Sequence, residues 1–186
     1  HHLDRRVLDL PQDVHHEPLR LTAGRAVPDR DQFHMVFLHH TLQDLGCTLA
    51  YWVQRDRWLA GEYPGGATRE ATRARLAALV ALGIDTFVDL TTPGELPAYD
   101  AALAPGVLHI RKPIPDHGLP LEPEHMGEII GVIDELLGDG RRLYLHCRAG
   151  IGRTGMVVGC HLAQHGVRGD AALDAGHGAQ ATDVGY

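Results

Sequence analysis

A cysteine, a glycine-rich turn and an arginine stand close together in one segment of the chain. Residues 146–155 read His-Cys-Arg-Ala-Gly-Ile-Gly-Arg-Thr-Gly and lie between the apolar runs 143–145 and 156–158. A strand that leads through such a loop into a helix points backbone N–H groups and the positive end of the helix dipole at one place, which forms an anion site. This setting favours the nucleophilic thiolate form of Cys147. The pattern predicts attack by a thiolate on phosphorus.

Arg153 is placed to complete that anion site. Five residues separate it from Cys147, so the loop can curl around a tetrahedral anion and return the guanidinium to its oxygens. A planar guanidinium binds two phosphate oxygens at once. Thr154 adds a hydroxyl that can stabilise the departing thiolate, and hydrogen bonds from His146 can order the loop and tune the cysteine. The predicted phosphate-binding loop consists of Arg148, Ala149, Gly150, Ile151, Gly152 and Arg153.

A carboxylate upstream is positioned to act as an acid. Residues 112–120, Lys-Pro-Ile-Pro-Asp-His-Gly-Leu-Pro, hold two prolines before Asp116 and a glycine and a proline after it. Such a segment is stiff and non-helical, so we expect Asp116 on a surface turn. A positioned carboxylic acid that protonates a leaving oxygen contributes about 10²–10⁴ in rate. Asp116 is therefore either the general acid or a turn residue only. The presence of the Cys147 loop in the same chain favours the role of general acid.

The elements around these residues predict one α/β domain. Apolar residues at three- and four-residue spacing indicate a helix that begins near Pro123 and ends before Gly138, and another over 69–82. Short apolar runs predict strands at 86–90, 107–110 and 143–145. This order favours a central, mostly parallel sheet flanked by helices, with the ligand at the carboxyl ends of the strands. Glu95 follows a strand aimed at that edge, so it either pairs with Arg153 or stays a solvated loop carboxylate.

Residues 146–155 resemble the signature of the cysteine-dependent protein phosphatases, the tyrosine and dual-specificity superfamily. The signature is His-Cys, two residues, Gly, two residues, Arg, Ser or Thr, and Gly, and each fixed position is matched. Asp116 stands 31 residues before Cys147, an offset similar to that of the acid loop in dual-specificity phosphatases. Residues 57–65 resemble the opening segment of small superfamily members. The resemblance runs from about Tyr51 to about Gly166.

The resemblance implies a phosphomonoester hydrolase that acts through a phosphocysteine intermediate, as a protein-tyrosine or dual-specificity phosphatase with a phosphatase-like fold. Its expected partner is a phosphorylated protein or a small phosphoester. Alternatives are a phosphoinositide or RNA 5′-phosphatase of the same superfamily, or a catalytically silent phosphate-binding module. We expect no cofactor and no metal, because the loop supplies the positive charge that a metal would otherwise supply.

Two other sequence patterns suggest different functions, a dinucleotide site and a metal site, but they account for fewer of the residues described above. Residues 150–155 also match G-x-G-x-x-G, yet a dinucleotide site would leave Cys147 and Arg153 without a role. Histidines are abundant, 14 in all, and several are adjacent in sequence. Adjacent residues of a strand point to opposite faces, so we expect no metal site from these pairs. The pairs are His1 and His2, His15 and His16, and His39 and His40.

Composition and charge favour a soluble protein of one domain. The 186 residues are 44% hydrophobic and 22% charged, and the net charge of −7 argues against nucleic acid as a general partner. No apolar stretch is long enough to span a bilayer. Three cysteines provide no disulfide framework and a catalytic thiol must stay reduced, so we expect a cytoplasmic location. Of the other two cysteines, Cys47 lies outside the resemblance and Cys160 is expected to be a small buried hydrophobe.

The chain divides into three parts by this reasoning. Residues 1–49 have mixed charge and little periodicity, and we expect a disordered or loosely docked N-terminal extension. Residues 50–168 form the predicted phosphatase-like domain. Residues 169–186 lose the pattern of a packed helix, and we expect an atypical or truncated C-terminal tail.

Overall fold

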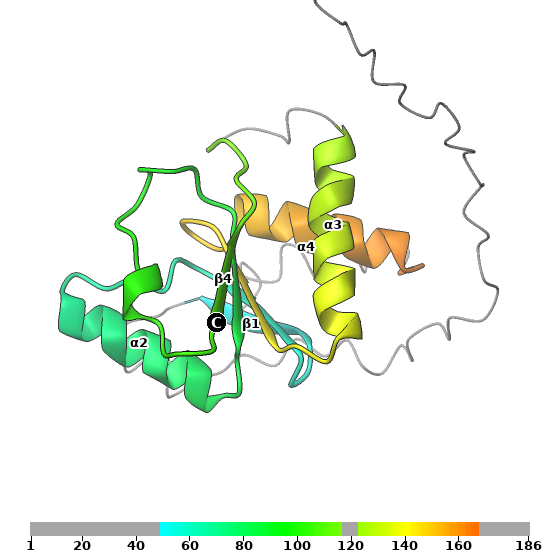
Figure 1. Ribbon diagram of the computed structural model, residues 1–186. Coiled ribbons are helices and arrows are strands. Elements are labelled where there is room, and N and C mark those ends of the chain that lie inside the picture. The colour runs from blue at the N-terminus through cyan, green and yellow to red at the C-terminus, as the bar shows by residue number, and fades with distance from the viewer. Residues whose placement is uncertain (1–48, 117–122, 168–186) are drawn as a thin grey trace, which may run out of the picture.

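A five-stranded sheet with helices on both faces forms the body of the protein (Figure 1). The structure, a computed structural model, describes residues 49–116 and 123–167. In chain order its elements are β1 (Ala50–Gln54), β2 (Trp58–Gly61), α2 (Arg69–Ala81), β3 (Thr86–Asp89), the 3₁₀ helix η2 (Asp100–Ala102), β4 (Leu108–Arg111), α3 (Pro123–Gly138), β5 (Leu143–His146) and α4 (Gly152–Gln164).

The sheet is mostly parallel, as the sequence predicts. Its strand order is β1-β2-β5-β3-β4, and β2, β5, β3 and β4 run parallel to one another. Among the described strands, β1 alone is antiparallel to its neighbour β2. The β1–β2 hairpin was not predicted from the sequence, in which residues 57–65 resemble only an opening segment. The prediction of a single α/β domain with a mostly parallel sheet is confirmed.

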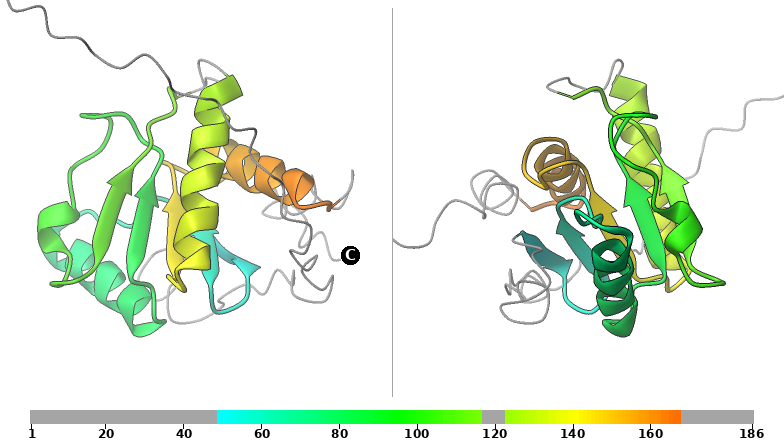
Figure 2. Two further views of the ribbon diagram at one scale, coloured as in Figure 1. Left: turned by 45° about the vertical axis from the view of Figure 1, so that its right-hand side comes forward. Right: turned by 90° about the vertical axis from the view of Figure 1, so that its left-hand side faces the viewer.

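Successive side chains of each strand point to opposite faces of the sheet, so a separate hydrophobic core forms on each face. On β5, Leu143 and Leu145 pack with the apolar sides of α3 and α4, whereas Tyr144 between them packs with Leu76 and Leu79 of α2. The strands β1, β2 and β3 divide their side chains in the same way. Figure 2 shows the result, with α2 on one side of the sheet and α3 and α4 on the other. Both faces are buried, as parallel sheets require.

The register of the parallel strands brings their carboxyl ends to one edge. Gly61 of β2 pairs with His146 of β5, His146 pairs with Asp89 of β3, and Asp89 pairs with Arg111 of β4. The segments that follow these four strands therefore leave the sheet side by side. They include the Cys147 loop, the segment with Glu95 and the segment with Asp116, which is how residues distant in sequence meet.

Other expectations have mixed outcomes. The predicted helices agree with α2 and α3 within one or two residues, and Thr68 caps α2 by accepting a hydrogen bond from the Ala71 N–H at 3.1 Å. The prediction for Cys160 is wrong, because it lies on an exposed position of α4. Within the described residues, no helix is long and apolar enough to cross a membrane. The extension, the C-terminal tail, Cys47 and the adjacent histidine pairs fall outside the described ranges.

Candidate active site

The loop after β5 depends on a glycine that permits both its conformation and its packing. Gly150 has a φ of 75°, in the left-handed region that favours glycine. A Cβ atom there would stand 2.6 Å from the backbone nitrogen of Glu62, in the segment after β2. That segment also holds the loop directly, since the Tyr63 N–H donates to the Arg148 carbonyl at 3.0 Å. Any side chain at residue 150 would push the loop away from this support.

Cys147 opens this loop at the edge of the buried core. It is 3% exposed, and it lines a cavity of about 360 Å³ together with Asp116, Arg148, Ala149, Gly152, Arg153 and Met156. A larger hollow of about 560 Å³ lies beside α2, but no cysteine or carboxylate lines it. Cys147 and the N-terminus of α4 therefore share the smaller cavity with two arginines and one aspartate.

Arg153 is fixed by a bidentate ion pair. Its Nη1 donates to Glu95 Oε2 at 2.8 Å and its Nη2 donates to Glu95 Oε1 at 2.6 Å. Nη1 also donates to the Ile114 carbonyl at 3.0 Å. The arginine and glutamate side chains are only 4% and 7% exposed. Of the two alternatives for Glu95, the structure has the pairing with Arg153 and not the solvated carboxylate.

The pair keeps both groups charged. Hydrogen bonds from Arg153 are the largest influence on Glu95 and lower its pKa to about 2. The hydrogen bonds to Glu95 in turn raise the pKa of Arg153. A guanidinium held in one orientation by two short, charge-assisted bonds is pre-organised to bind a tetrahedral anion.

Asp116 reaches the same guanidinium from the loop after β4. It lies in a turn with its side chain 41% exposed, as predicted, and its Oδ1 is 3.0 Å from Arg153 Nη2. The loop is attached to the segment directly after β3, because the Ile114 N–H donates to the Leu90 carbonyl at 3.0 Å. Glu95, Ile114 and Asp116 together engage the N–H groups on both Nη atoms of Arg153. Only the Nε–H of its five donors remains outside these contacts.

His146 lies beneath the loop as a neutral ring. Burial lowers the pKa of His146 to about 4, more strongly than the nearby Asp89 carboxylate raises it. Its Nδ1 lies 3.1 Å from the Cys147 carbonyl and its Nε2 lies 2.6 Å from the Tyr99 hydroxyl. The tautomer with hydrogen on Nδ1 satisfies both contacts: Nδ1–H donates to the carbonyl and the tyrosine O–H donates to Nε2. The histidine thus orders the start of the loop.

Sequence reasoning missed the partners of His146. Tyr99 is 2% exposed and Asp89 is 1% exposed, and neither was singled out. Burial would raise the pKa of Asp89, but hydrogen bonds from His109 and from Thr91 hold it below its usual range. An acid at the end of an apolar strand is the signal that could have revealed Asp89. Tyr99 follows no periodic pattern, so only the tertiary structure places it.

The remaining predicted residues lie where the sequence places them. Arg148, Ala149, Ile151 and Gly152 are exposed along the loop, and Arg148 Nε is 3.6 Å from Glu95 Oε1. The Thr154 hydroxyl is buried and has no hydrogen-bond partner among the described residues. Its action on the Cys147 sulfur stays a prediction.

A cysteine-headed anion loop at the carboxyl edge of a mostly parallel sheet, with a clasped arginine and a nearby acid, defines the class of cysteine-dependent phosphatases. Comparison with known families makes the assignment specific. A family described as "Polymorphic toxin system, DSP-PTPase phosphatase" matches residues 62–167, and the chain belongs to this family.

Individual relatives agree with that family. The chain is 34% identical over 113 residues to the candidate tyrosine phosphatase 067L of Invertebrate iridescent virus 3, covering 58% of this chain and 43% of the viral protein. It is 30% identical over 106 residues to the candidate tyrosine phosphatase 197R of Invertebrate iridescent virus 6, covering 54% of this chain and 36% of the viral protein. The chain thus spans less than half the length of either viral relative.

Solved structures show the same fold. The phosphatase Tk-PTP in its active form is 27% identical with a TM-score of 0.56, and the match covers 67% of this chain and 80% of that one. A kinase-associated phosphatase with serine in place of its catalytic cysteine is 22% identical with a TM-score of 0.57, covering 79% of this chain and 83% of that one. The second likeness supports the fold alone.

Proposed function

We propose that this protein hydrolyses phosphomonoesters through a covalent phosphocysteine intermediate and that phosphotyrosine is among its substrates. The observation that carries the proposal is the clasp of Arg153 by Glu95 beside Cys147. A buried guanidinium in a fixed orientation, next to a thiol at a helix N-terminus, is suited to hold a phosphoryl group for attack. Support for phosphotyrosine comes from the viral relative named for tyrosine phosphatase activity, at 34% identity.

The first step transfers the phosphoryl group to sulfur. The loop N–H groups and Arg153 bind the non-bridging oxygens, and an oxygen of the substrate takes the place that Asp116 occupies on Nη2. The Cys147 thiolate attacks phosphorus, forming the S–P bond while the bond to the leaving oxygen breaks. Asp116, displaced from the arginine, takes up a proton from solvent as the dianion binds and donates that proton to the leaving oxygen.

The second step releases phosphate. A water molecule attacks phosphorus, its proton passes to Asp116, and the S–P bond breaks to regenerate the thiolate. The buried hydroxyl of Thr154 donates to the sulfur as its negative charge returns. Charge on the transferred group is neutralised by the loop dipoles and by Arg153 in both steps.

The test compares the full chain with its Cys147→Ser variant on an aryl phosphate in the presence of a chelator. We expect turnover by the native protein only, because serine keeps the loop geometry but is not ionised near neutral pH. Rapid acid quench and mass spectrometry should find one phosphoryl group on Cys147. Residual turnover by a contaminant-free Cys147→Ser protein would refute the covalent mechanism.

A panel of substrates then defines the specificity. It contains phosphotyrosine, phosphoserine and phosphothreonine peptides, phosphoinositides and an RNA with a 5′-phosphate. Preference for the phosphotyrosine peptide supports the proposal, and preference for a lipid or RNA end contradicts its substrate. Vanadate binding without hydrolysis of any member would show a silent phosphate-binding module.

A further inference from the structure

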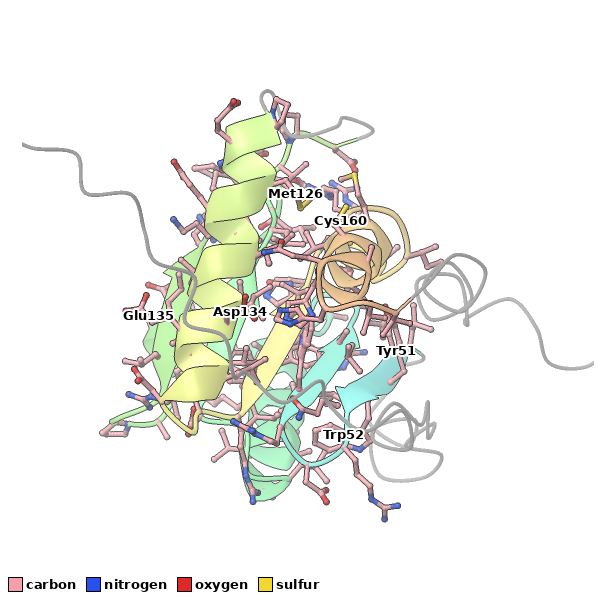
Figure 3. The ribbon with its side chains drawn as sticks, turned by 90° about the vertical axis from the view of Figure 1, so that its right-hand side faces the viewer. Tyr51, Trp52, Met126, Asp134, Glu135 and Cys160 are labelled. Carbon is pink, nitrogen blue, oxygen red and sulfur yellow. The ribbon has the colours of Figure 1, made fainter. Side chains whose placement is uncertain are left out.

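A second cluster of titratable side chains lies between α3 and α4, away from the Cys147 loop. His161 and His165 stand four residues apart at the C-terminal end of α4, and Asp134 belongs to α3. Both Nε2 atoms approach the same carboxylate oxygen, Asp134 Oδ1, at 3.0 Å for His161 and 2.9 Å for His165. Figure 3 shows Asp134 on the side of α3 that faces α4, whereas Glu135 points away from α4.

The donor atoms have the chemistry and spacing of a zinc site. One ligand atom from each residue lies within 4.8 Å of the other two. Zn²⁺ binds imidazole nitrogen and carboxylate oxygen at about 2.0–2.2 Å, so two ligands of one tetrahedral ion lie about 3.3 Å apart. The observed N–O separations of 3.0 and 2.9 Å need to widen only slightly. Histidines four residues apart on a helix share one face, which lets both rings reach the same ion.

The three side chains of the cluster differ in solvent exposure, and this difference would allow an ion to enter from solution. Asp134 and His165 have side chains 21% and 22% exposed, so the ion has a path to them. His161 is 8% exposed and its ring packs edge-on against Trp58 with centroids 4.7 Å apart. One ligand is therefore held firmly by the core while the other two can adjust around the metal.

We propose that Asp134, His161 and His165 bind one Zn²⁺ ion that ties α3 to α4. In the hydrogen-bonded cluster each Nε2–H donates to Asp134. Zinc binding moves that hydrogen to Nδ1 of the same ring, so that the Nε2 lone pair binds the ion in place of the hydrogen bond. Three protein ligands leave a fourth position for water. His161 lies nine residues beyond Gly152, about 13 Å along the helix from the Cys147 loop. The ion therefore acts on the packing of α4 and not on the phosphoryl group, and the proposal does not depend on phosphatase activity.

The experiment uses the full chain with Cys147→Ser, because the catalytic thiolate would itself bind zinc. This protein is compared with the same protein carrying Asp134→Asn and His165→Ala, and with a matched control carrying Cys160→Ser, which removes an exposed thiol adjacent to His161 on α4. After treatment with a chelator and its removal, each protein is titrated with ZnCl₂ by calorimetry and its thermal unfolding is followed with and without Zn²⁺. Histidines elsewhere in the chain are the same in all three proteins.

We expect the Asp134→Asn, His165→Ala protein to lose one binding equivalent and to bind at that site at least about 100-fold more weakly, whereas the Cys160→Ser control matches its parent. Saturating Zn²⁺ should raise the Tm of the Cys147→Ser parent by about 5 °C or more, and it should not change the Tm of the protein that also carries Asp134→Asn and His165→Ala. His165→Cys keeps a zinc ligand but not the imidazole, so it should bind Co²⁺ with a sulfur-to-metal charge-transfer band. Equal zinc affinity in all proteins, or no binding by the parent, would overturn the proposal and leave the cluster as a hydrogen-bonded clamp.

Discussion

Replacing Glu95 by glutamine tests whether the clasp on Arg153 supports both stability and function. Glutamine keeps the shape of the side chain and one oxygen acceptor, but it places an NH₂ group against an N–H of the guanidinium. One of the two charge-assisted bonds, at 2.6 and 2.8 Å, is then lost. A hydrogen bond to a charged group contributes about 1.5–3 kcal/mol, and removing one partner of a buried ion pair costs about 3–5 kcal/mol.

We expect Glu95→Gln to lower the free energy of unfolding by about 2–4 kcal/mol, toward the lower end of those ranges because the amide still accepts one bond. For a domain of this size the Tm should fall by about 5–15 °C. The Ile114 carbonyl still holds Nη1, so Arg153 stays near the loop and kcat/KM should fall by about 10–100-fold, or about 1.4–2.8 kcal/mol in transition-state stabilisation. Vanadate affinity should fall with it.

Thermal unfolding, vanadate titration and aryl phosphate kinetics check these effects in parallel. Glu135→Gln is the matched control, because it makes the same chemical change at an exposed position of α3. If Glu95→Gln resembles Glu135→Gln in Tm, vanadate affinity and kcat/KM, the ion pair contributes neither to folding nor to phosphate binding, and the reasoning from its burial is refuted.

Three further substitutions test the other groups of the site. Asp116→Asn should lower kcat by about 10²–10⁴ on alkyl phosphates and much less on an activated aryl phosphate. The variant should bind vanadate more tightly than the native protein does. Equal losses of kcat on both substrates would remove Asp116 from its role as the acid. Arg153→Lys should lose most oxyanion affinity and turnover, because an ammonium cannot make the bidentate contact, and near-native values in both assays would contradict this role. Burial lowers the pKa of His146 to about 4 from 6.5, so the unfolded chain takes up the extra proton as pH falls through this window and stability declines by about 3 kcal/mol. Denaturant titrations between pH 7 and about pH 4 should show a smaller decline for His146→Asn, and an unchanged slope would show that another group is responsible.

The Cys147 loop could be predicted from the sequence because its chemistry and its fold are both local. A strand, a glycine turn and a helix N-terminus follow one another within residues 143–158, and Cys147 and Arg153 belong to that one unit. Asp116 could be predicted because its flanking prolines restrict the loop to a surface turn. The periodicity of α3 was equally clear, since Ile129, Ile133 and Leu137 repeat at helical spacing and are buried.

The features that escaped prediction depend on contacts between distant segments. The hydrogen bond from Tyr99 to His146 spans 47 residues, and no local pattern specifies it. The pairing of Arg153 with Glu95 spans 58 residues, and the sequence could offer it only as one of two alternatives. The β1–β2 hairpin has four buried residues in a row on β2, so strand alternation gave no signal. Cys160 was predicted to be buried from its residue type and its place on the helix after the loop, but it lies on an exposed position of α4. His161 and His165 stand one helical turn apart on α4, but the carboxylate that both approach, Asp134, belongs to α3, so no local pattern shows the cluster.

The arrangement around Arg153 allows one residue to serve both the resting site and the proposed reaction. Its Nη2 contacts Glu95 at 2.6 Å and Asp116 at 3.0 Å, so the acid loop rests on the same edge of the guanidinium that a phosphate must use. Glu95 is buried and approaches through two bonds, whereas Asp116 is 41% exposed and contributes one ion pair that water can screen. We therefore expect, on the proposed mechanism, that an incoming dianion displaces Asp116 and leaves Glu95 in place. In that mechanism, binding of the phosphoryl group and release of Asp116 toward the leaving oxygen are a single event.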